Sequence, residues 1–486
     1  MVRRVFLVVA AGVMILGVLA SRLPEGGTTV ASDSEIRALL VDHVDVQHKS
    51  VGSVVGIVTP QGRRILSYGR LNQGDPRPLD GDTVFEVGSV TKIFTALLLA
   101  DMVQRGEVAL KDPVTKYLGA GIKVPSRGGK PIALVDLATH TSGLPFFPPD
   151  IPLKDPVEAG RAIAKYSVNQ VHEFLAQYEL PTDPGSRWAY SNLGYALLGE
   201  ALARRFGKDY EVLIRERITS PLGLESTAIT VSPQMRPRLA IGHDAHLQVT
   251  PEVAMPAFVP AGCLRSSAND LLTLLSAFTG DRKSSLAPAM AAMFETRRPG
   301  PGVEQALGWW IVKVGADDAG FVAFGGQTLG YATTLAYDPK TRIGVVVLSN
   351  GTQDDGGLGW HLLRPSFPVA TAATQRARDD EARKEVTLDP KVLDTYAGEY
   401  RVASGPTAGD IATIERRGDV LVLKAPTTPP EGVRLHAKDE HDLFLTEANI
   451  HITVETDIEG RARRLIFHFA GTDTAATRID ASEGKQ

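Results

Sequence analysis

The stretch Phe85-Glu86-Val87-Gly88-Ser89-Val90-Thr91-Lys92 precedes an apolar run from Ile93 to Val103. Alanine, leucine, methionine and phenylalanine dominate this run, and Arg105-Gly106 provides a stop signal, so we predict a helix. Its apolar residues occupy nearly the whole circumference, which predicts a helix buried on all sides. We therefore expect the domain to be built around this helix.

Ser89 stands at the predicted N-terminus of this helix, where free N–H groups and the helix dipole favour a developing anion. Lys92 lies three residues on and shares its face of the helix. Burial lowers the pKa of a lysine, so Lys92 can serve as a base for the adjacent hydroxyl. The alternative for Ser89 is a helix N-cap. A second Ser-x-x-Lys match, Ser482 to Lys485, lies in a polar tail and is assigned no function.

The composition describes an ordinary globular protein of 486 residues, with 43% hydrophobic and 22% charged residues, and the length predicts two or three domains. A net charge of −4 gives no reason to expect a nucleic acid partner. The single cysteine, Cys263, excludes an intrachain disulfide and is expected to be a buried, inert thiol. No Cys/His cluster has metal-ligand spacing, so we expect no metal site.

The N-terminus has the pattern of an export signal. A basic start, Met1 to Arg4, is followed by an apolar run from Val5 to Ala20. We predict that residues 1–20 form a signal peptide and that the protein is exported to the periplasm or cell envelope. The alternative is an uncleaved N-terminal membrane anchor.

The remaining chain divides into two predicted domains. The first, residues 35–360, combines β-rich segments with a helical region at about 111–260. Residues 361–390 are polar and read as a linker, and residues 391–482 alternate like the strands of a small barrel or sandwich. Strands of the first domain are predicted at residues 54–58, 65–68, 309–314, 321–324, 331–337 and 343–348.

Three loops carry further chemistry-bearing residues. His140-Thr141-Ser142-Gly143 suggests a catalytic pair, although we favour a structural turn with hydrogen-bonded His and Ser side chains. Tyr190-Ser191-Asn192 precedes a helix, for which Ser191 or Asn192 is a natural cap. Phe324-Gly325-Gly326 follows a predicted strand, where glycines let a substrate backbone approach, and a plain hairpin is the alternative.

Taken together, Ser89-x-x-Lys92, Tyr190-Ser191-Asn192 and Phe324-Gly325-Gly326 resemble the ordered motifs of the penicillin-recognising serine hydrolases. The Tyr-x-Asn form is similar to the branch holding class C β-lactamases, D-alanyl-D-alanine carboxypeptidases and related esterases. This resemblance, over roughly residues 35 to 355, implies an α/β (α+β) fold of the β-lactamase/transpeptidase type. That fold has an antiparallel sheet with flanking helices and an all-helical region. The module at 391–482 resembles the lipocalin-like β domains appended to some of these hydrolases.

The resemblance implies roles for individual residues. Ser89 would be the acylated nucleophile, Lys92 its base, and Tyr190 the group that passes a proton to the leaving group and activates the deacylating water. Asn192 would hold the substrate amide or Lys92. The oxyanion hole would be the backbone N–H groups of Ser89 and Gln327, and no metal or organic cofactor is implied. The substrate-binding loop would comprise Phe324, Gly325, Gly326, Gln327 and Thr328.

One position departs from the family pattern. The third motif usually begins with Lys or His, which helps to bind a substrate carboxylate, whereas this chain has Phe324. We therefore expect an exported acyl-enzyme hydrolase of D-alanyl peptides or related amides, with an esterase for uncharged substrates as the alternative. A third hypothesis is a ligand-binding or penicillin-sensing ectodomain without turnover. Arg265 is a candidate for supplying the missing cation from elsewhere.

Overall fold

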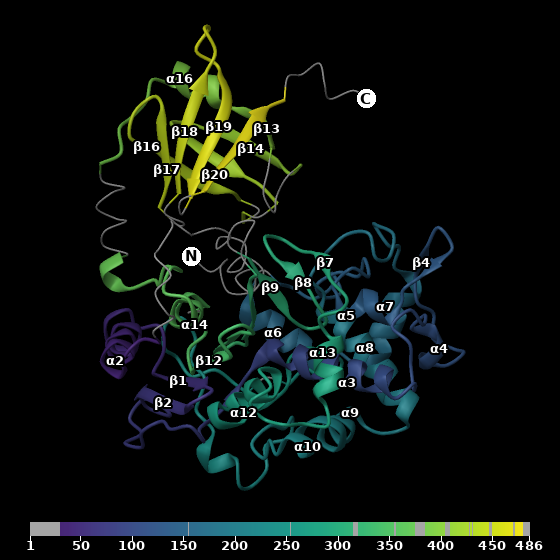
Figure 1. The fold of residues 1–486 in the computed structure, drawn as a ribbon. Helices are drawn as coiled ribbons and strands as arrows, with labels where there is room; N and C mark the ends of the chain where they lie inside the picture. Colours follow the sequence, from purple (N-terminus) through teal and green to yellow (C-terminus); the bar gives the residue numbers. More distant parts are fainter. Residues whose placement is uncertain are drawn as a thin grey trace.

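The computed structural model describes residues 30–479 apart from residues 154, 253, 314–318, 354–355, 375–383, 404–408, 427, 430, 447–449 and 470–471. The expected signal peptide or anchor, residues 1–20, lies outside the described residues. Within the described part, no helix has both the length and the apolar character needed to cross a membrane. Figure 1 shows a larger α/β body and a smaller β body.

The larger body is organised around an antiparallel sheet. All strands that the sequence predicts for the first domain lie in this sheet, and the strand after Gly320 is longer than expected because it continues to Gln327. In spatial order the strands are β2 (Gly62–Gly69), β1 (Gly52–Thr59), β12 (Ile343–Ser349), β11 (Ala332–Asp338), β10 (Phe321–Gln327), β9 (Trp310–Val312), β8 (Glu304–Gln305) and β7 (Arg298–Pro299).

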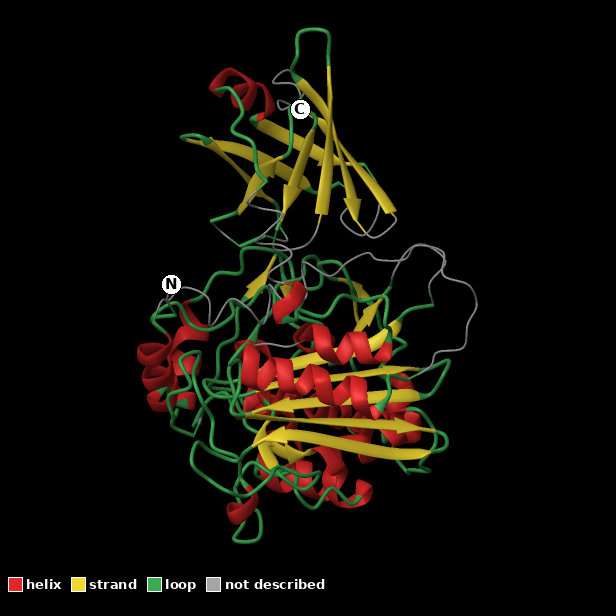
Figure 2. Cartoon of the chain, turned by 90° about the vertical axis from the view of Figure 1, so that its left-hand side faces the viewer, coloured by secondary structure: helices red, strands yellow, loops and turns green. Residues whose placement is uncertain are grey.

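Helices cover both faces of the sheet, as Figure 2 shows for the face turned to the viewer. On one face, α14 (Gly356–Leu363) packs so closely that a Cβ on Gly359 would lie 2.6 Å from Thr334. On the other, α12 (Ala268–Phe278) places Leu275 against Gly344. The remaining helices around the sheet are α2 (Asp33–Val41), η2 (Asp42–Val46) and α13 (Ala287–Ala292).

The region expected to be all-helical holds mainly helices, but a short hairpin of β4 (Ser126–Arg127) and β5 (Lys130–Pro131) interrupts it. Because proline and glycine break the pattern repeatedly, most of its helices are short. They are α4 (Thr115–Leu118), α5 (Leu134–Ala138), α6 (Pro156–Lys165), α7 (Val168–Gln177), α8 (Asn192–Phe206), α9 (Tyr210–Ile214), η4 (Arg215–Thr219), α10 (Ser220–Leu222), η5 (Arg236–Arg238) and α11 (Val259–Gly262).

The helix predicted after Ser89 is α3 (Thr91–Gln104), and it is buried all round. A 3₁₀ turn, η3 (Gly88–Val90), leads into it from strand β3 (Val84–Glu86), which pairs with β6 (Arg265–Ser267). Gly88 has φ +51°, a left-handed conformation that glycine adopts without strain. The turn therefore presents Ser89 at the head of a helix that the rest of the body encloses.

The smaller body is a closed antiparallel barrel, which settles the choice between barrel and sandwich. Alternating apolar residues fill its interior, and α16 (Pro390–Tyr396) contributes Leu393 and Tyr396 to that core. Closure removes the exposed edges of the sheet. Its strands are β13 (Gly398–Val402), β14 (Ile411–Arg417), β15 (Val420–Lys424), β16 (Val433–Ala437), β17 (Asp442–Leu445), β18 (Ile450–Thr456), β19 (Ala462–Phe469) and β20 (Thr472–Arg478).

In its described parts, the segment expected as a linker, residues 361–390, places side chains in the core of one body or the other. Phe367 is 1% exposed and packs edge-on against Phe321 and Trp360 in the core of the larger body. Leu388 belongs to the core of the barrel. The stretch that can act as a linker is therefore shorter than the composition suggests.

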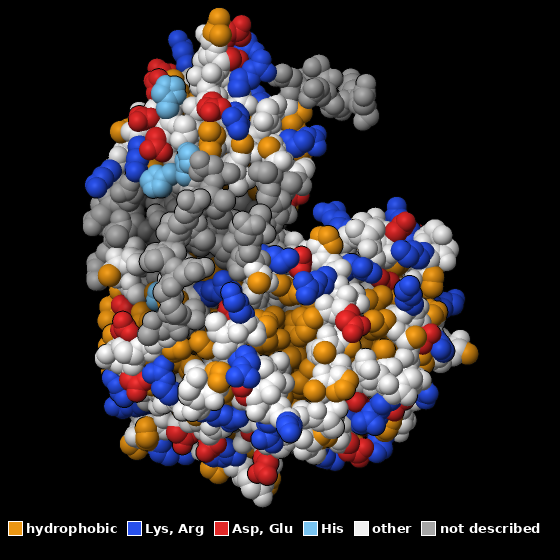
Figure 3. All heavy atoms as spheres, viewed as in Figure 1, with side chains coloured by type: hydrophobic (Ala, Val, Ile, Leu, Met, Phe, Trp, Pro, Cys, Tyr) orange, Lys and Arg blue, Asp and Glu red, His pale blue; other side chains and the backbone are white. Residues whose placement is uncertain are grey.

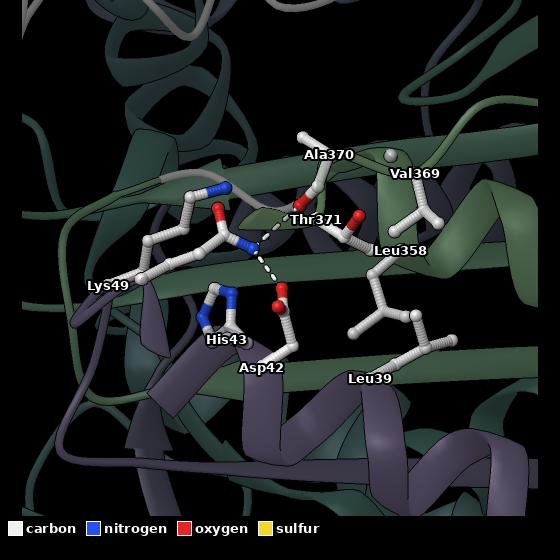
Figure 4. Close-up of a pocket in the computed structure, with 10 residues that line it drawn as sticks. Leu39, Asp42, His43, Lys49, Leu358, Val369, Ala370 and Thr371 are labelled. Atoms are coloured by element: carbon white, nitrogen blue, oxygen red, sulfur yellow. Dashed lines mark hydrogen bonds between the residues drawn. The ribbon is translucent and has the colours of Figure 1, made fainter. Parts of the chain in front are cut away.

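Residues 369–372 extend along the N-terminal helices of the larger body. The Gln47 side chain donates to the carbonyl of Ala370 and to Asp42, and the Ala372 N–H donates to the Asp42 carboxylate. Figure 4 shows the pocket left between these segments, with His43 and Lys49 at its wall. The end of the larger body is thus attached to its beginning.

We predict that the larger body requires residues up to 374. Ending the chain after Arg364 removes Phe367, and deleting a buried phenylalanine side chain costs about 3–5 kcal/mol. In thermal denaturation, residues 30–374 should therefore unfold well above residues 30–364, and Phe367→Ala in the full chain should lower the same transition. Equal transitions for the two truncated chains would contradict this view.

Candidate active site

Ser89 lies at the centre of a three-residue cluster assembled from two distant segments. Its Oγ is 3.0 Å from the Nζ of Lys92, and the hydroxyl of Tyr190 donates to it at 2.8 Å. All three side chains are buried, although Ser89 remains 8% exposed. The two motifs predicted to act together are therefore brought into direct contact.

Two hydrogen-bond acceptors hold the amine of Lys92 and so orient its lone pair. Its Nζ donates at 2.7 Å to the Oδ1 of Asn192 and at 2.7 Å to the carbonyl of Ala261. Burial lowers the pKa of Lys92 well below its ordinary range, which favours the neutral amine. A neutral amine has two N–H groups and one lone pair. With both N–H groups used by these acceptors, the lone pair faces the Ser89 hydroxyl.

Two aromatic rings also face the lysine. The Nζ of Lys92 lies 4.9 Å from the ring centre of Tyr190 and 5.6 Å from that of Tyr195. Asn192 and Tyr195 are three residues apart on α8 and therefore share a face of that helix. The sequence reasoning missed Tyr195, although this spacing from Asn192 was a signal that could have identified it. These rings favour the ammonium form once Lys92 takes a proton.

Tyr190 is a neutral hydrogen-bond donor in this arrangement. Burial raises its pKa above the ordinary tyrosine value, although its hydrogen bond to Ser89 opposes that shift. The next residue, Ser191, caps α8 by accepting from the N–H of Gly194 at 2.8 Å. The motif therefore serves both purposes considered for it, since Ser191 is the cap and Tyr190 and Asn192 reach the site.

The third motif passes directly over the nucleophile turn. A Cβ on Gly326 would lie 2.0 Å from the carbonyl oxygen of Val87 and 2.9 Å from the nitrogen of Ser89. A Cβ on Gly88 would lie 2.7 Å from the nitrogen of Gln327. Only glycine permits this approach, which brings the backbone N–H groups of Ser89 and Gln327 to the same small region.

The loop after this strand forms the edge of the site. The Gln327 amide donates to the carbonyl of Thr352, and the Thr352 hydroxyl donates to the carbonyl of Thr328. Leu329 follows and packs on Gly160 of α6. Figure 3 shows hydrophobic side chains gathered in a hollow near α6, β8 and β9.

Phe324 points to the same face of β10 as Gly326, but it is only 1% exposed. Its ring lies 4.5 Å from that of Trp310. The indole N–H groups of Trp310 and Trp188 both donate to the Oε1 of Gln305, at 3.0 and 3.2 Å. Trp188 and Trp310 thus form an aromatic wall near the position where the family pattern has a cation. The buried ring of Phe324 packs against the Trp310 side of this wall.

Arg265 is engaged elsewhere. Its guanidinium is paired with Glu86 at 3.0 Å and lies 3.7 Å from Glu252, and it also donates to the carbonyl of Ile229. Because its side chain is buried in these contacts, it is placed to stabilise the β3–β6 region. The structure therefore favours a structural role for Arg265.

The His140 loop does not form a catalytic pair with Ser142. The Nδ1 of His140 accepts from the N–H of Ser191 at 3.1 Å, and the Ser142 hydroxyl accepts from the N–H of Leu144 at 3.3 Å. The preferred interpretation, a hydrogen-bonded structural turn, is confirmed.

Cys263 is buried, as expected, and burial raises the pKa of its thiol to about 12. It is therefore a protonated, unreactive thiol at neutral pH. Among the residues that the structure describes, no group of three or more His, Cys, Asp or Glu side chains is arranged to hold a metal ion.

Comparison with known proteins agrees with this geometry. The family model described as "Beta-lactamase" matches residues 36–365. A D-alanyl-D-alanine-carboxypeptidase/endopeptidase, AmpH of Escherichia coli K12, is 30% identical over 328 residues, which cover 65% of this chain and 83% of AmpH. A penicillin-binding protein of Bacillus subtilis is 24% identical over 470 residues, covering 90% of this chain and 97% of that protein.

Solved structures show the same relationship. A class C β-lactamase from Rhodobacter sphaeroides has a TM-score of 0.59 and 26% identity, covering 68% of this chain and 98% of that one. A β-lactamase/D-alanine carboxypeptidase from Yersinia pestis has a TM-score of 0.57 with 26% identity and the same coverage of both chains. The expected fold, an antiparallel sheet with helices followed by a barrel, is confirmed. The chain belongs to the β-lactamase family of serine hydrolases.

Proposed function

We propose that this protein hydrolyses D-alanyl peptides of the peptidoglycan type, or related amides, through an acyl-enzyme on Ser89. The observation that carries the proposal is the position of Ser89 Oγ, within hydrogen-bond distance of both Lys92 Nζ and the Tyr190 hydroxyl. A nucleophile between a desolvated amine and a neutral phenol has one group to accept its proton and another to donate one.

Acylation would then proceed with a closed proton balance. Ser89 attacks the substrate carbonyl carbon while its hydroxyl proton moves to the lone pair of Lys92. The negative charge develops on the carbonyl oxygen, which the N–H groups of Ser89 and Gln327 would stabilise; such a donor is typically worth about 3 kcal/mol. When the tetrahedral intermediate collapses, Tyr190 gives its proton to the leaving group and recovers one from Lys92.

Deacylation would use the same groups in reverse. Water attacks the acyl carbon, its proton passes to the Lys92–Tyr190 pair, and Ser89 leaves as the restored hydroxyl. Asn192 keeps Lys92 in place throughout, because it accepts one N–H whether the amine is neutral or charged. No step needs a metal or an organic cofactor.

The proposed substrate class rests on similarity to known proteins and on the expected location of the enzyme. AmpH is a D-alanyl-D-alanine-carboxypeptidase/endopeptidase by name, and its similarity extends over 328 residues, or 65% of this chain. An exported location, in the periplasm or cell envelope, would place the enzyme with such peptides and agrees with the basic and apolar N-terminal pattern. We further propose a catalytic domain, a short linker and a C-terminal β domain as separate units.

A carboxylesterase acting on small uncharged esters is the second candidate. It is favoured by one observation: Phe324, at the position where a carboxylate-binding cation is expected, is buried against Trp310 with the ring centres 4.5 Å apart, so an apolar contact replaces the charge. An apolar wall gives a neutral acyl or alkyl group a favourable environment and gives a carboxylate none.

Replacing Ser89 with alanine should abolish hydrolysis and covalent labelling. Intact-mass spectrometry after exposure to p-nitrophenyl esters, a D-Ala-D-Ala peptide and a penicillin should show an adduct on the wild-type protein and none on Ser89→Ala. A transient adduct indicates turnover, whereas a lasting one indicates a receptor. Ser482→Ala, in the other Ser-x-x-Lys match, is the matched control and should behave as wild type. Turnover by Ser89→Ala at the wild-type rate would disprove the nucleophile.

The pH dependence should follow the protonation of Lys92. Because the base must be neutral, kcat/KM should rise with pH through the lowered pKa of Lys92 and level off well below the ordinary lysine value of about 10.4. The raised pKa of Tyr190 keeps its phenol protonated across this plateau. The profile should be recorded with a neutral ester, and a rise centred near pH 10 would show that Lys92 is not the desolvated base.

Introducing a cation at the third motif should change substrate preference. Phe324→His should raise kcat/KM for a penicillin relative to a neutral ester about tenfold, because a charge-assisted hydrogen bond to a carboxylate is worth about 1.5–3 kcal/mol. Phe324→Leu is the control for lost aromatic packing and should not shift this ratio. An efficient wild-type penicillinase that Phe324→His does not improve would leave Phe324 with a packing role only.

A further inference from the structure

His140 accepts hydrogen bonds from the backbone on both sides of Tyr190. The Ala189 N–H donates to the carbonyl oxygen of His140 at 2.7 Å, and the Ser191 N–H donates to its Nδ1 at 3.1 Å. The residues before and after Tyr190 are thus both bonded to one residue of a separate loop. This double contact fixes the position of the Tyr190 Cα.

The histidine ring fixes the tyrosine ring as well. The two rings are stacked with their centres 4.3 Å apart and their planes 26° apart, and the ring of Tyr195 lies 5.0 Å from His140 on another side. His140 is fully buried, so solvent does not compete for these contacts. With these backbone and ring contacts in place, the Tyr190 hydroxyl is directed toward Ser89 Oγ, to which it donates at 2.8 Å.

This arrangement requires a neutral imidazole. Nδ1 accepts a hydrogen bond, so the ring proton sits on Nε2, and protonation of Nδ1 would oppose the Ser191 N–H. Burial, with the nearby Lys92 adding to it, lowers the pKa of His140 well below the ordinary histidine value. The φ of His140 is +58°, a left-handed conformation in which histidine, asparagine and aspartate are enriched among the non-glycine residues.

We propose that His140 is the positioning residue of Tyr190, holding the phenol where it can protonate a poor leaving group. The proposal rests on the proposed function of Tyr190 as proton donor. His140 does not touch the substrate; it acts only through Tyr190. Its loss should therefore matter in proportion to how much the reaction needs a delivered proton.

Two esters with the same acyl group provide the test. Ethyl butyrate expels an alkoxide that must be protonated, whereas p-nitrophenyl butyrate expels a stable phenolate that needs no proton. Asparagine at position 140 tolerates the left-handed backbone and keeps an acceptor near Nδ1, but it loses the stacked ring. For His140→Asn, kcat/KM with the ethyl ester should fall about 10- to 100-fold, which is part of the usual contribution of a general acid. With the nitrophenyl ester, kcat/KM should stay within about threefold of the wild-type value.

Matched variants separate this role from general damage. His43→Asn is the control, because His43 is also a buried histidine. It lies at the pocket of Figure 4, which none of Ser89, Lys92 and Tyr190 lines, so both rates should stay unchanged. Tyr190→Phe should show the same leaving-group dependence as His140→Asn. Adding His140→Asn to Tyr190→Phe should cost little more, because linked groups are non-additive. His140→Gly, which also tolerates the left-handed backbone and lacks the stacked ring, should show the same selective loss if the asparagine variant fails to fold.

The outcomes distinguish the two levels of the proposal. An equal loss with both esters in a folded His140 variant, or a fully multiplicative loss in the double variant, would overturn the positioning role. If Tyr190→Phe itself shows no leaving-group dependence, the proposed function of Tyr190 fails instead. A selective loss for both single variants without further loss in the double supports the positioning role.

Discussion

The desolvated amine of Lys92 is the constraint on which the site depends. A lysine with 0% exposure is stable only if its polar hydrogens have acceptors, and here two come from parts of the chain far from α3, Asn192 on α8 and the carbonyl of Ala261 on α11. The three helices must pack together around one nitrogen. The same packing removes water from the base, which lowers the pKa of Lys92 and favours the neutral amine with its free lone pair.

Much of this arrangement follows from local sequence patterns. The apolar run of α3, the strands of the sheet and the serine cap of α8 are short-range features, and each motif residue lies on an element that the sequence indicated. The acceptor carbonyl of Ala261 has no side-chain signature at all. The hydrogen bond between Trp188 and Gln305, and the packing of Phe367 on Phe321, join residues more than 40 positions apart, and no local period in the sequence records such contacts.

The aromatic wall shows how the site accommodates Phe324 in place of the Lys or His of the family pattern. Gln305 is fully buried and uses both its oxygen and its nitrogen, since its amide also donates to the carbonyls of Ala306 and Trp309. This amide joins the loop before Tyr190 to β9, on which Phe324 packs. A rigid, neutral wall stabilised in this way maintains the shape of the site without a charge at its third motif.

The pairing of β1 with β12 has a consequence for how the protein acquires activity. Ser53 and Ser349 are register partners, and their hydroxyls are 2.7 Å apart across nearly 300 residues of intervening chain. Closing so long a loop is entropically slow, and it requires the chain to be synthesised almost to its second body. The glycines of β10 reach the Ser89 turn only within this completed sheet. A partly made chain therefore carries the nucleophile but lacks the strand that completes its site, so hydrolytic competence arises late, after the ends of the catalytic body have met.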